Sequence, residues 1–253
     1  MLLEDRNAII YGGGGQIGGA IARAFAREGA RVHLTGRTRT TLEKVADDIR
    51  AQGGRAETAE VDALDEAAVD AHADAVARDA GGIDISLSVI ADGDVQGTPV
   101  AGMSLDDYLR PVTTAVTSKF LTARAAARHM IPRRSGVIMM FGGTGNLSAI
   151  RDYHVGGFLT ALDAAESLRR QLAVELGRYG IRVVTLRTSG VPETLGADFL
   201  EREAIERLIV DPTLLGRAAT LEDVGNVAVF AASDWARTLT GTAINMTCGA
   251  DLD

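Results

Sequence analysis

The sequence predicts an α/β fold in which a doubly wound, seven-stranded parallel sheet forms a single domain over residues 1–253. Short β-branched or apolar runs alternate with long amphipathic segments from end to end, which is typical of βαβ units. The first apolar run leads into four consecutive glycines and then into a helical segment. With 253 residues, 46% of them hydrophobic, the chain can bury the core of one such domain.

Each expected element follows from its pattern. The strands are short β-branched or apolar runs, expected at residues 7–11, 31–35, 56–61, 83–90, 136–141, 181–187 and 242–247. The helices have apolar residues at helical spacing, and we expect them at 17–29, 40–52, 65–79, 105–130, 157–178 and 221–232. Ser104 and Thr220 stand where N-cap oxygens begin two of these helices. Residues 191–216 interrupt the alternation with prolines and glycines around a short charged helix, which predicts a substrate-side loop able to close over a substrate.

The glycine-rich turn after the first strand predicts a Rossmann-type dinucleotide site. Gly12, Gly15 and Gly18 follow the strand and begin the helix, as the glycines of a dinucleotide site do. A tight turn without a ligand is the alternative, but this placement favours the nucleotide site. Glycines let the backbone approach a pyrophosphate, and the positive end of the helix dipole, at Gln16 and Ile17, favours the phosphate charge. We therefore expect these five residues to bind the cofactor.

The segment after the second strand predicts NADP, with NAD the less favoured cofactor. An NAD site usually has a carboxylate there for the ribose hydroxyl, whereas this chain has Gly36, Arg37 and Thr38. Arg37 suits the 2′-phosphate of NADP, although a solvated surface arginine is the alternative. Asp62, followed by Ala63, ends the third strand and is expected to meet the adenine edge; the alternative is a helix cap.

Charge and cysteine content exclude several classes of function. The net charge of -8 and the pI near 5.1 argue against a nucleic-acid partner, which normally needs a basic surface. Cys248 is the only cysteine, so an intrachain disulfide and a thiolate metal cluster are excluded, and no metal site is predicted. No stretch approaches the ~20 apolar residues of a membrane span. We expect a cytoplasmic protein without a membrane partner.

Further motifs follow the pattern of one enzyme family, and they fall at residues 61–65, 82–85, 172–183, 215–226 and 239–241. Together with the glycine turn they make the chain resemble the short-chain dehydrogenase/reductase family over nearly its whole length. The resemblance implies an oxidoreductase that acts on a small molecule and forms tetramers or dimers. It also implies that the nicotinamide lies near the carboxyl ends of the fourth to sixth strands.

The resemblance also assigns cofactor contacts after the fourth and sixth strands. Ile90 and Ala91 end the segment that matches the family's Asn-Asn-Ala-Gly. Val191 and Thr194 lie in the segment that matches its Pro-Gly turn and its nicotinamide-contacting threonine. All four residues are expected to bind the cofactor.

The departures from the family pattern concern the chemistry. The family's catalytic asparagine, serine, tyrosine and lysine match Ala115, Gly143, Phe158 and Leu162. In the usual mechanism a tyrosine phenol protonates the carbonyl oxygen, and a nearby ammonium lowers the pKa of that phenol. Phe158 has no proton to give, and Gly143 has no hydroxyl to hold the substrate oxygen. The usual catalytic machinery is therefore missing.

Three residues could replace that machinery. Tyr153 is the only tyrosine in the segment and has Arg151 and His154 nearby, so it is the candidate proton donor; an aromatic packed at the mouth of the cleft is the alternative. His154 and Thr144 are the other candidates, and a hydroxyl bonded to loop backbone is the alternative for Thr144.

Three functions compete. The first is an NADP(H) oxidoreductase that reduces a carbonyl or enone with a non-standard active site. The second is an isomerase, lyase or cyclase that uses the same pocket. The third is an inactive NADP-binding protein.

Overall fold

The strands of the computed structural model, which describes residues 1–143, 153–196 and 202–252, form a seven-stranded parallel sheet. Its order is β3-β2-β1-β4-β5-β6-β7. The strands are β1 (Asn7–Tyr11), β2 (Arg31–Gly36), β3 (Arg55–Glu60), β4 (Ile85–Ser88), β5 (Gly136–Gly143), β6 (Ile181–Thr188) and β7 (Thr242–Asn245). The predicted doubly wound α/β fold is confirmed. The order reverses between β1 and β4, and sheets of this kind bind ligands beyond the carboxyl ends of the strands at such a point.

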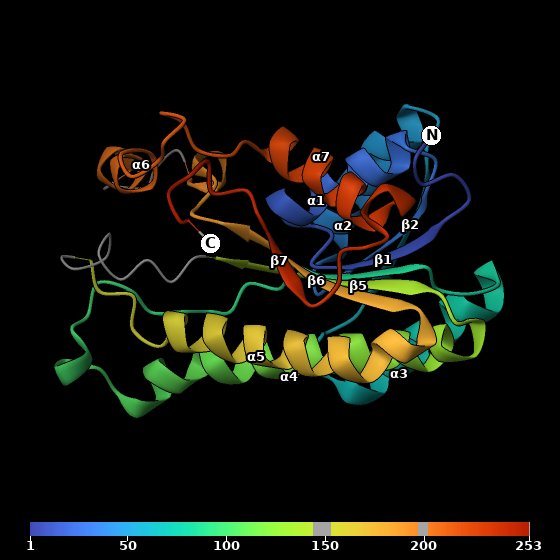
Figure 1. Ribbon diagram of the computed structural model, residues 1–253, viewed down its shortest axis with the longest axis horizontal. Helices are drawn as coiled ribbons and strands as arrows, with labels where there is room; N and C mark the ends of the chain where they lie inside the picture. The colour runs from blue at the N-terminus through green and yellow to red at the C-terminus, as the bar shows by residue number, and fades with distance from the viewer. Residues whose placement is uncertain (144–152, 197–201, 253) are drawn as a thin grey trace.

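The helices form a layer on each face of the sheet (Figure 1). They are α1 (Gln16–Arg27), α2 (Arg39–Ala51), α3 (Glu66–Ala80), α4 (Leu105–Arg133), α5 (Phe158–Leu176), α6 (Arg202–Val210) and α7 (Leu221–Ala232). One layer contains α1, α2 and α7, and the other contains α3, α4 and α5. The short charged helix α6 stands at the end toward which β5 and β6 run. Within the described residues, no helix is long and apolar enough to cross a bilayer.

Side chains that alternate along the buried strands fill a core on each face of the sheet. In β1, Ile10 packs with Leu34 and Phe25 under α1 and α2, whereas Ile9 and Tyr11 point into the core under α3 and α4. This alternation is what period-2 side-chain geometry produces when both faces of a parallel sheet are covered.

The fourth strand is shorter than the predicted 83–90, and the difference helps to form the site. Backbone bonds to β1 continue on both sides of β4, from Asp84 N to Asn7 O and from Val89 N to Tyr11 O, each 2.9 Å. Ile83 is fully buried in the core before the strand begins. At Ile90 the chain leaves the sheet, so the residues after β4 can line a cavity.

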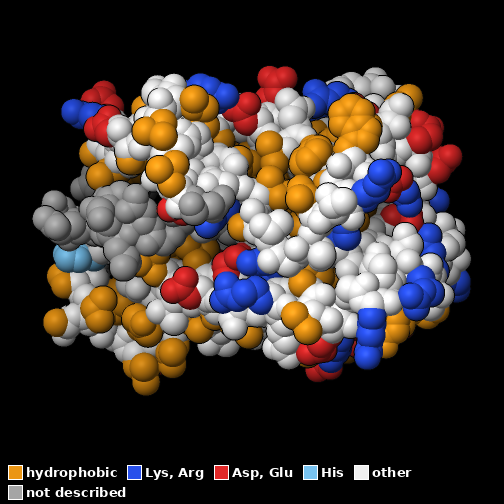
Figure 2. Space-filling model, viewed as in Figure 1, with side chains coloured by type: hydrophobic (Ala, Val, Ile, Leu, Met, Phe, Trp, Pro, Cys, Tyr) orange, Lys and Arg blue, Asp and Glu red, His pale blue; other side chains and the backbone are white. Residues whose placement is uncertain are grey.

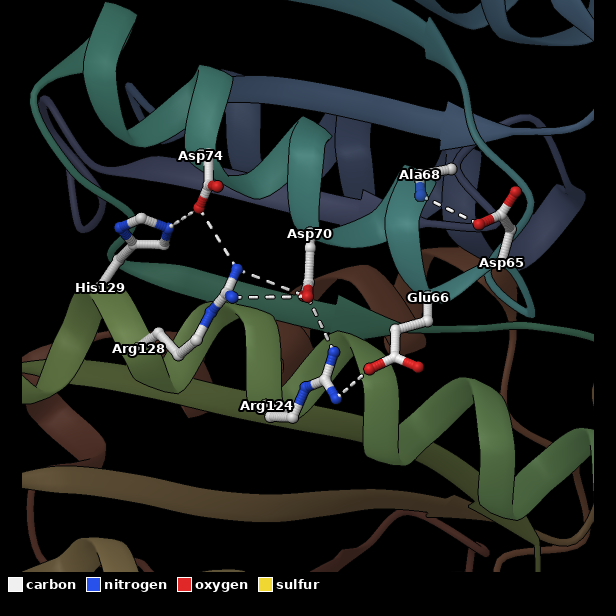
Figure 3. Close-up of polar contacts among 8 residues, drawn as sticks. All are labelled: Asp65, Glu66, Ala68, Asp70, Asp74, Arg124, Arg128 and His129. Carbon is white, nitrogen blue, oxygen red and sulfur yellow. Dashed lines mark hydrogen bonds and ion pairs between the residues drawn. The ribbon is translucent and has the colours of Figure 1, made fainter.

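Ion pairs hold α3 against α4 (Figure 3). Arg124 on α4 donates to Glu66 at 2.6 Å and to Asp70 at 2.8 Å on α3. One turn further along α4, Arg128 lies 3.2 Å from Asp74 and 3.3 Å from Asp70. These contacts hold α4 beside α3 on one face of the sheet.

The two ends of the molecule differ in surface chemistry. In Figure 2, hydrophobic side chains gather at the end where α4 begins, and charged side chains are most numerous at the opposite end. Val100 and Leu105, in and just after the short 3-10 helix η1 (Val100–Gly102), are 63% and 70% exposed. The end that carries the carboxyl edges of β5 and β6 therefore exposes hydrophobic side chains around the start of α4.

Candidate functional site

A cavity of about 570 Å³ opens at the carboxyl ends of the central strands. Its walls come from the turn after β1, the loop after β4, the end of β5, the first turns of α5 and the loop after β6. Eight of the residues expected to bind the cofactor line it: Gly12, Gly15, Gln16, Ile17, Gly18, Ile90, Ala91 and Thr194. The structure thus brings together residues that are up to 182 positions apart (194 minus 12).

Close backbone packing explains two of the glycines in the turn. Gly12 has φ +89°, and a Cβ there would lie 2.5 Å from the carbonyl oxygen of Val89. A Cβ on Gly18 would lie 2.2 Å from the carbonyl oxygen of Gly12. Gly12 and Gly13 also donate their N–H groups to Thr35 O, at 2.8 and 3.0 Å. The turn is therefore fixed between β2, the β4 loop and α1.

The third glycine leaves the start of α1 open toward the cavity. Gly15 is the N-cap of α1 and offers no side-chain cap to the first N–H groups of the helix. A Cβ on Gly15 would meet nothing closer than Gly12 O at 3.4 Å, so packing does not require glycine there. Uncapped N–H groups and the positive helix dipole make this position suitable for a phosphate. The side chain of Gln16, the first residue of α1, reaches the loop after β6, where its Nε2 donates to Thr194 O at 3.3 Å.

The residues predicted to contact the adenosine half lie further along the same edge of the sheet. Arg37 and Thr38 follow β2, Asp62 follows β3, and all three side chains are exposed. None of the three belongs to the cavity wall, and neither does Ala63, which is buried. Asp62 Oδ1 accepts from Leu64 N at 3.0 Å, while Asp65 is the residue that caps α3.

The loop after β6 begins with well-fixed residues. Val191 is buried and does not face the cavity, but its carbonyl oxygen accepts from the Thr194 hydroxyl at 2.8 Å. Glu193 accepts a hydrogen bond from Leu221 N at the start of α7. The predicted short charged helix in this segment is α6, Arg202–Val210.

Three of the four positions expected to match the family's catalytic residues form an apolar part of the cavity. Phe158 and Leu162 project from the first two turns of α5, and Gly143 ends β5. A Cβ on Gly143 would lie 3.3 Å from Leu162 Cδ1, so the leucine side chain already occupies the neighbouring space. Ala115 is fully buried in α4. These four positions offer no proton and no side-chain hydrogen bond.

The candidate substitutes are not brought to the described cavity wall. Tyr153 is half-buried, His154 is exposed, and neither is among the described residues that line the cavity. The backbone of His154 instead accepts from Gly97 N at 2.7 Å. Thr144 lies outside the described residues, as does Arg151.

The structure reveals a charged pair beside the cavity that sequence reasoning missed. Asp92, in the loop after β4, lines the cavity, and its Oδ1 lies 3.3 Å from Lys119 Nζ on α4. The two side chains are only 9% and 2% exposed. Burial raises the pKa of the Asp92 carboxyl, and the Lys119 ammonium opposes that rise. A lysine one turn after Ala115, on a helix face of small buried residues, is the signal that could have pointed to this pair.

Comparisons with known proteins agree with the fold. The family described as Enoyl-(Acyl carrier protein) reductase matches residues 14–251. The chain is 30% identical to meso-2,3-butanediol dehydrogenase of Serratia marcescens over 99% of this chain and 96% of that one. It is 33% identical to a Xanthobacter autotrophicus protein named inactive 2-(S)-hydroxypropyl-CoM dehydrogenase 2, over 87% of this chain and 95% of that one.

A solved structure agrees with the architecture as well. A putative short-chain alcohol dehydrogenase from Sinorhizobium meliloti superposes with a TM-score of 0.85 at 27% identity, covering 98% of this chain and 97% of that one.

Proposed function

Because this chain belongs to the short-chain dehydrogenase/reductase family, we propose that it is an NADP(H)-dependent oxidoreductase that reduces a carbonyl or enone group of a small molecule. The observation that carries the proposal is the cavity, in which an uncapped helix N-terminus and an apolar chamber adjoin one another. Cofactor sites are concave and mostly apolar, with a few placed polar groups.

The residues of the chain fit a dinucleotide. The N–H groups at the start of α1, at Gln16 and Ile17, would hold the pyrophosphate. Arg37 and Thr38 would hold the 2′-phosphate, because an arginine fork and a hydroxyl suit that group and no carboxylate repels it. A Cβ at Gly36 would meet only Leu42, at 3.5 Å, so packing does not exclude an acidic side chain there.

The remaining contacts divide between the two halves of the cofactor. Asp62 and Ala63 are proposed for the adenine, and Ile90, Ala91, Val191 and Thr194 for the nicotinamide side. When bound, NADPH would supply the hydride. Phe158 and Leu162 would exclude water from around the reacting carbon. Fixed groups of the protein, and not solvent, would then surround the charge that forms on the substrate oxygen.

Cofactor preference gives the first test. We expect NADPH at 100 times its dissociation constant to stabilise the protein by about 2.7 kcal/mol, and NADH at the same concentration to stabilise it less. Equal thermal shifts for the two cofactors, or a larger shift with NADH, would contradict NADP selectivity. The loss of NADPH absorbance with a panel of ketones, enones and quinones then tests reduction.

The apolar catalytic positions favour a second candidate, a cofactor-binding protein that performs no hydride transfer, or an enzyme of non-redox chemistry. Gly143, Phe158 and Leu162 lack the groups on which the usual mechanism depends. Tight binding of NADPH without oxidation by any member of the panel would favour this candidate.

The proposal includes a cytoplasmic homo-oligomer, a dimer or tetramer, that binds neither nucleic acid nor membrane. Light scattering on the purified chain, with a monomer mass of 26.5 kDa, tests the assembly. A mass equal to one chain at micromolar concentration would contradict it.

A further inference from the structure

We propose that Asp92 is the group that exchanges a proton with the substrate in this cavity, and that Lys119 is its positioning residue. The inference rests on the proposed redox function, since it assigns the proton step of that reaction. It replaces Tyr153 as the donor with a carboxyl group that the structure places on the cavity wall.

Position supports the assignment first. Asp92 lies four residues after the end of β4, and it lines the same cavity as Phe158 and Leu162, where the usual tyrosine and lysine are missing. Lys119 lies one helical turn after Ala115, the position of the usual asparagine, and so on the same face of α4. The pair thus joins two of the segments that carry catalytic groups in the family pattern.

Burial supports it next. An ammonium that is 2% exposed is costly unless it is paired, and among the described residues Asp92 is its only hydrogen-bond acceptor. Ser118 and Thr122, the buried hydroxyl residues beside Lys119, donate to backbone carbonyls of α4 itself. Lys119 therefore holds the Asp92 carboxyl in one place, as a positioning residue must.

The charges around Asp92 suit proton exchange. Lys119 faces it from α4 and Asp94 faces it from its own loop. The Arg110 guanidinium, on the first turns of α4, pairs instead with Asp107 at 2.8 Å. Burial and Asp94 raise the pKa of the Asp92 carboxyl, while Lys119 opposes the rise and stabilises the carboxylate. A general acid works best when its pKa lies near the working pH. The pKa of an ordinary surface aspartate lies well below neutral pH, so a raised pKa suits Asp92 to this role.

The step balances for reduction of a carbonyl. When bound, the reduced cofactor would supply a hydride, with both its electrons, to the carbonyl carbon, so that the π pair of the carbonyl passes to its oxygen. The O–H bond of the Asp92 carboxyl breaks, and its proton goes to that oxygen to give the alcohol. Asp92 is left as a carboxylate beside Lys119, and water returns a proton to it. In alcohol oxidation the same carboxylate accepts the proton.

A binding experiment tests this without a known substrate. The nicotinamide ring of NADP⁺ carries a positive charge that NADPH lacks, so an ionised Asp92 should favour NADP⁺. For unit charges about 10 Å apart at an effective dielectric constant of ~20, the preference is about tenfold. We expect the ratio of the NADPH to the NADP⁺ dissociation constant to rise about tenfold as pH increases through the Asp92 titration.

Variants at these positions separate the groups involved. Asp92→Asn should abolish the pH dependence of this ratio, and Lys119→Met should move it to higher pH. Asp106→Asn, an exposed carboxylate in the first turn of α4, is the matched control and should behave as wild type. If Asp92→Asn fails to fold because Lys119 is left unpaired, the double variant Asp92→Asn/Lys119→Met removes both charges and takes its place.

The outcomes distinguish the inference from the function on which it rests. If wild type binds neither cofactor form, the proposed function fails. If wild type binds both and Asp92→Asn leaves the pH dependence intact, the inference is overturned and the function stands. Loss of the pH dependence in Asp94→Asn but not in Asp92→Asn also overturns it. Where a panel carbonyl is turned over, Asp92→Asn should lower kcat by about 10²-fold or more while NADPH affinity stays near wild type.

Discussion

Replacing Gly18 with alanine should damage both the fold and the cofactor site. The added Cβ would lie 2.2 Å from the carbonyl oxygen of Gly12 and 2.9 Å from its carbonyl carbon. Both are backbone atoms, and Gly12 is itself fixed by its N–H bond to Thr35 O at 2.8 Å, so α1 must move away from the turn. Overpacking of this kind typically costs about 1–3 kcal/mol. In a chain of this size, a loss of about 2 kcal/mol lowers Tm by about 4–8 °C.

Thermal unfolding and NADPH titration measure the two effects of this change. We expect Gly18→Ala to lose at least tenfold in NADPH affinity, because the N–H groups at the start of α1 would no longer point at the phosphate position. Gly177→Ala is the matched control, since a Cβ there has no heavy atom within 4 Å and its φ is -56°. A Gly18→Ala protein whose Tm and NADPH affinity equal those of wild type would refute the reasoning.

Three further changes have defined outcomes. Arg37→Asp should reverse the preference for NADPH over NADH, because a carboxylate repels the 2′-phosphate and accepts from the ribose hydroxyl; an unchanged ratio of dissociation constants would contradict the role of Arg37. Asp70→Ala removes a partner shared by Arg124 and Arg128, and should lower the free energy of unfolding by about 1 kcal/mol in urea without changing NADPH affinity. Burial, and then the charge of a neighbouring histidine, lower the pKa of His72 to about 4. In the unfolded chain this histidine has a pKa of about 6.5, so as pH falls it is protonated in the unfolded state before it is protonated in the folded state. The folded state therefore loses stability as pH falls from about 6.5 to 4. His72→Gln should flatten that acid slope, and an equally steep slope would contradict it.

The fold could be predicted because its signals are local and repeated. Most strands have a short β-branched or apolar run and the helices have their own periodicity, so the order of elements follows from the chain alone. The ends are less well defined: α1 begins at Gln16 instead of residue 17, and β4 stops at Ser88 instead of residue 90. Those ends depend on where the backbone leaves the sheet to form a cavity, which is decided by packing.

The site could be predicted only where one segment contains the whole signal. The glycine turn does, since Gly12 has φ +89° and a Cβ on Gly18 would meet the carbonyl oxygen of Gly12 within the same turn. The Asp92–Lys119 pair does not, because its members are 27 residues apart and meet only when the β4 loop packs on α4. The spacing of two charged residues in a sequence does not show whether their side chains form a buried pair or are both exposed to solvent.

The cost of the Asp92–Lys119 pair itself argues that it has a function. Replacing a buried ion pair with apolar residues of similar volume is often neutral or stabilising, by about 1–4 kcal/mol. The wall of the same cavity already contains the apolar side chains of Phe158 and Leu162. Two buried charges beside a cavity whose wall has Gly143, Phe158 and Leu162 where the family resemblance places a hydroxyl, a phenol and an ammonium form an arrangement that stability alone does not explain.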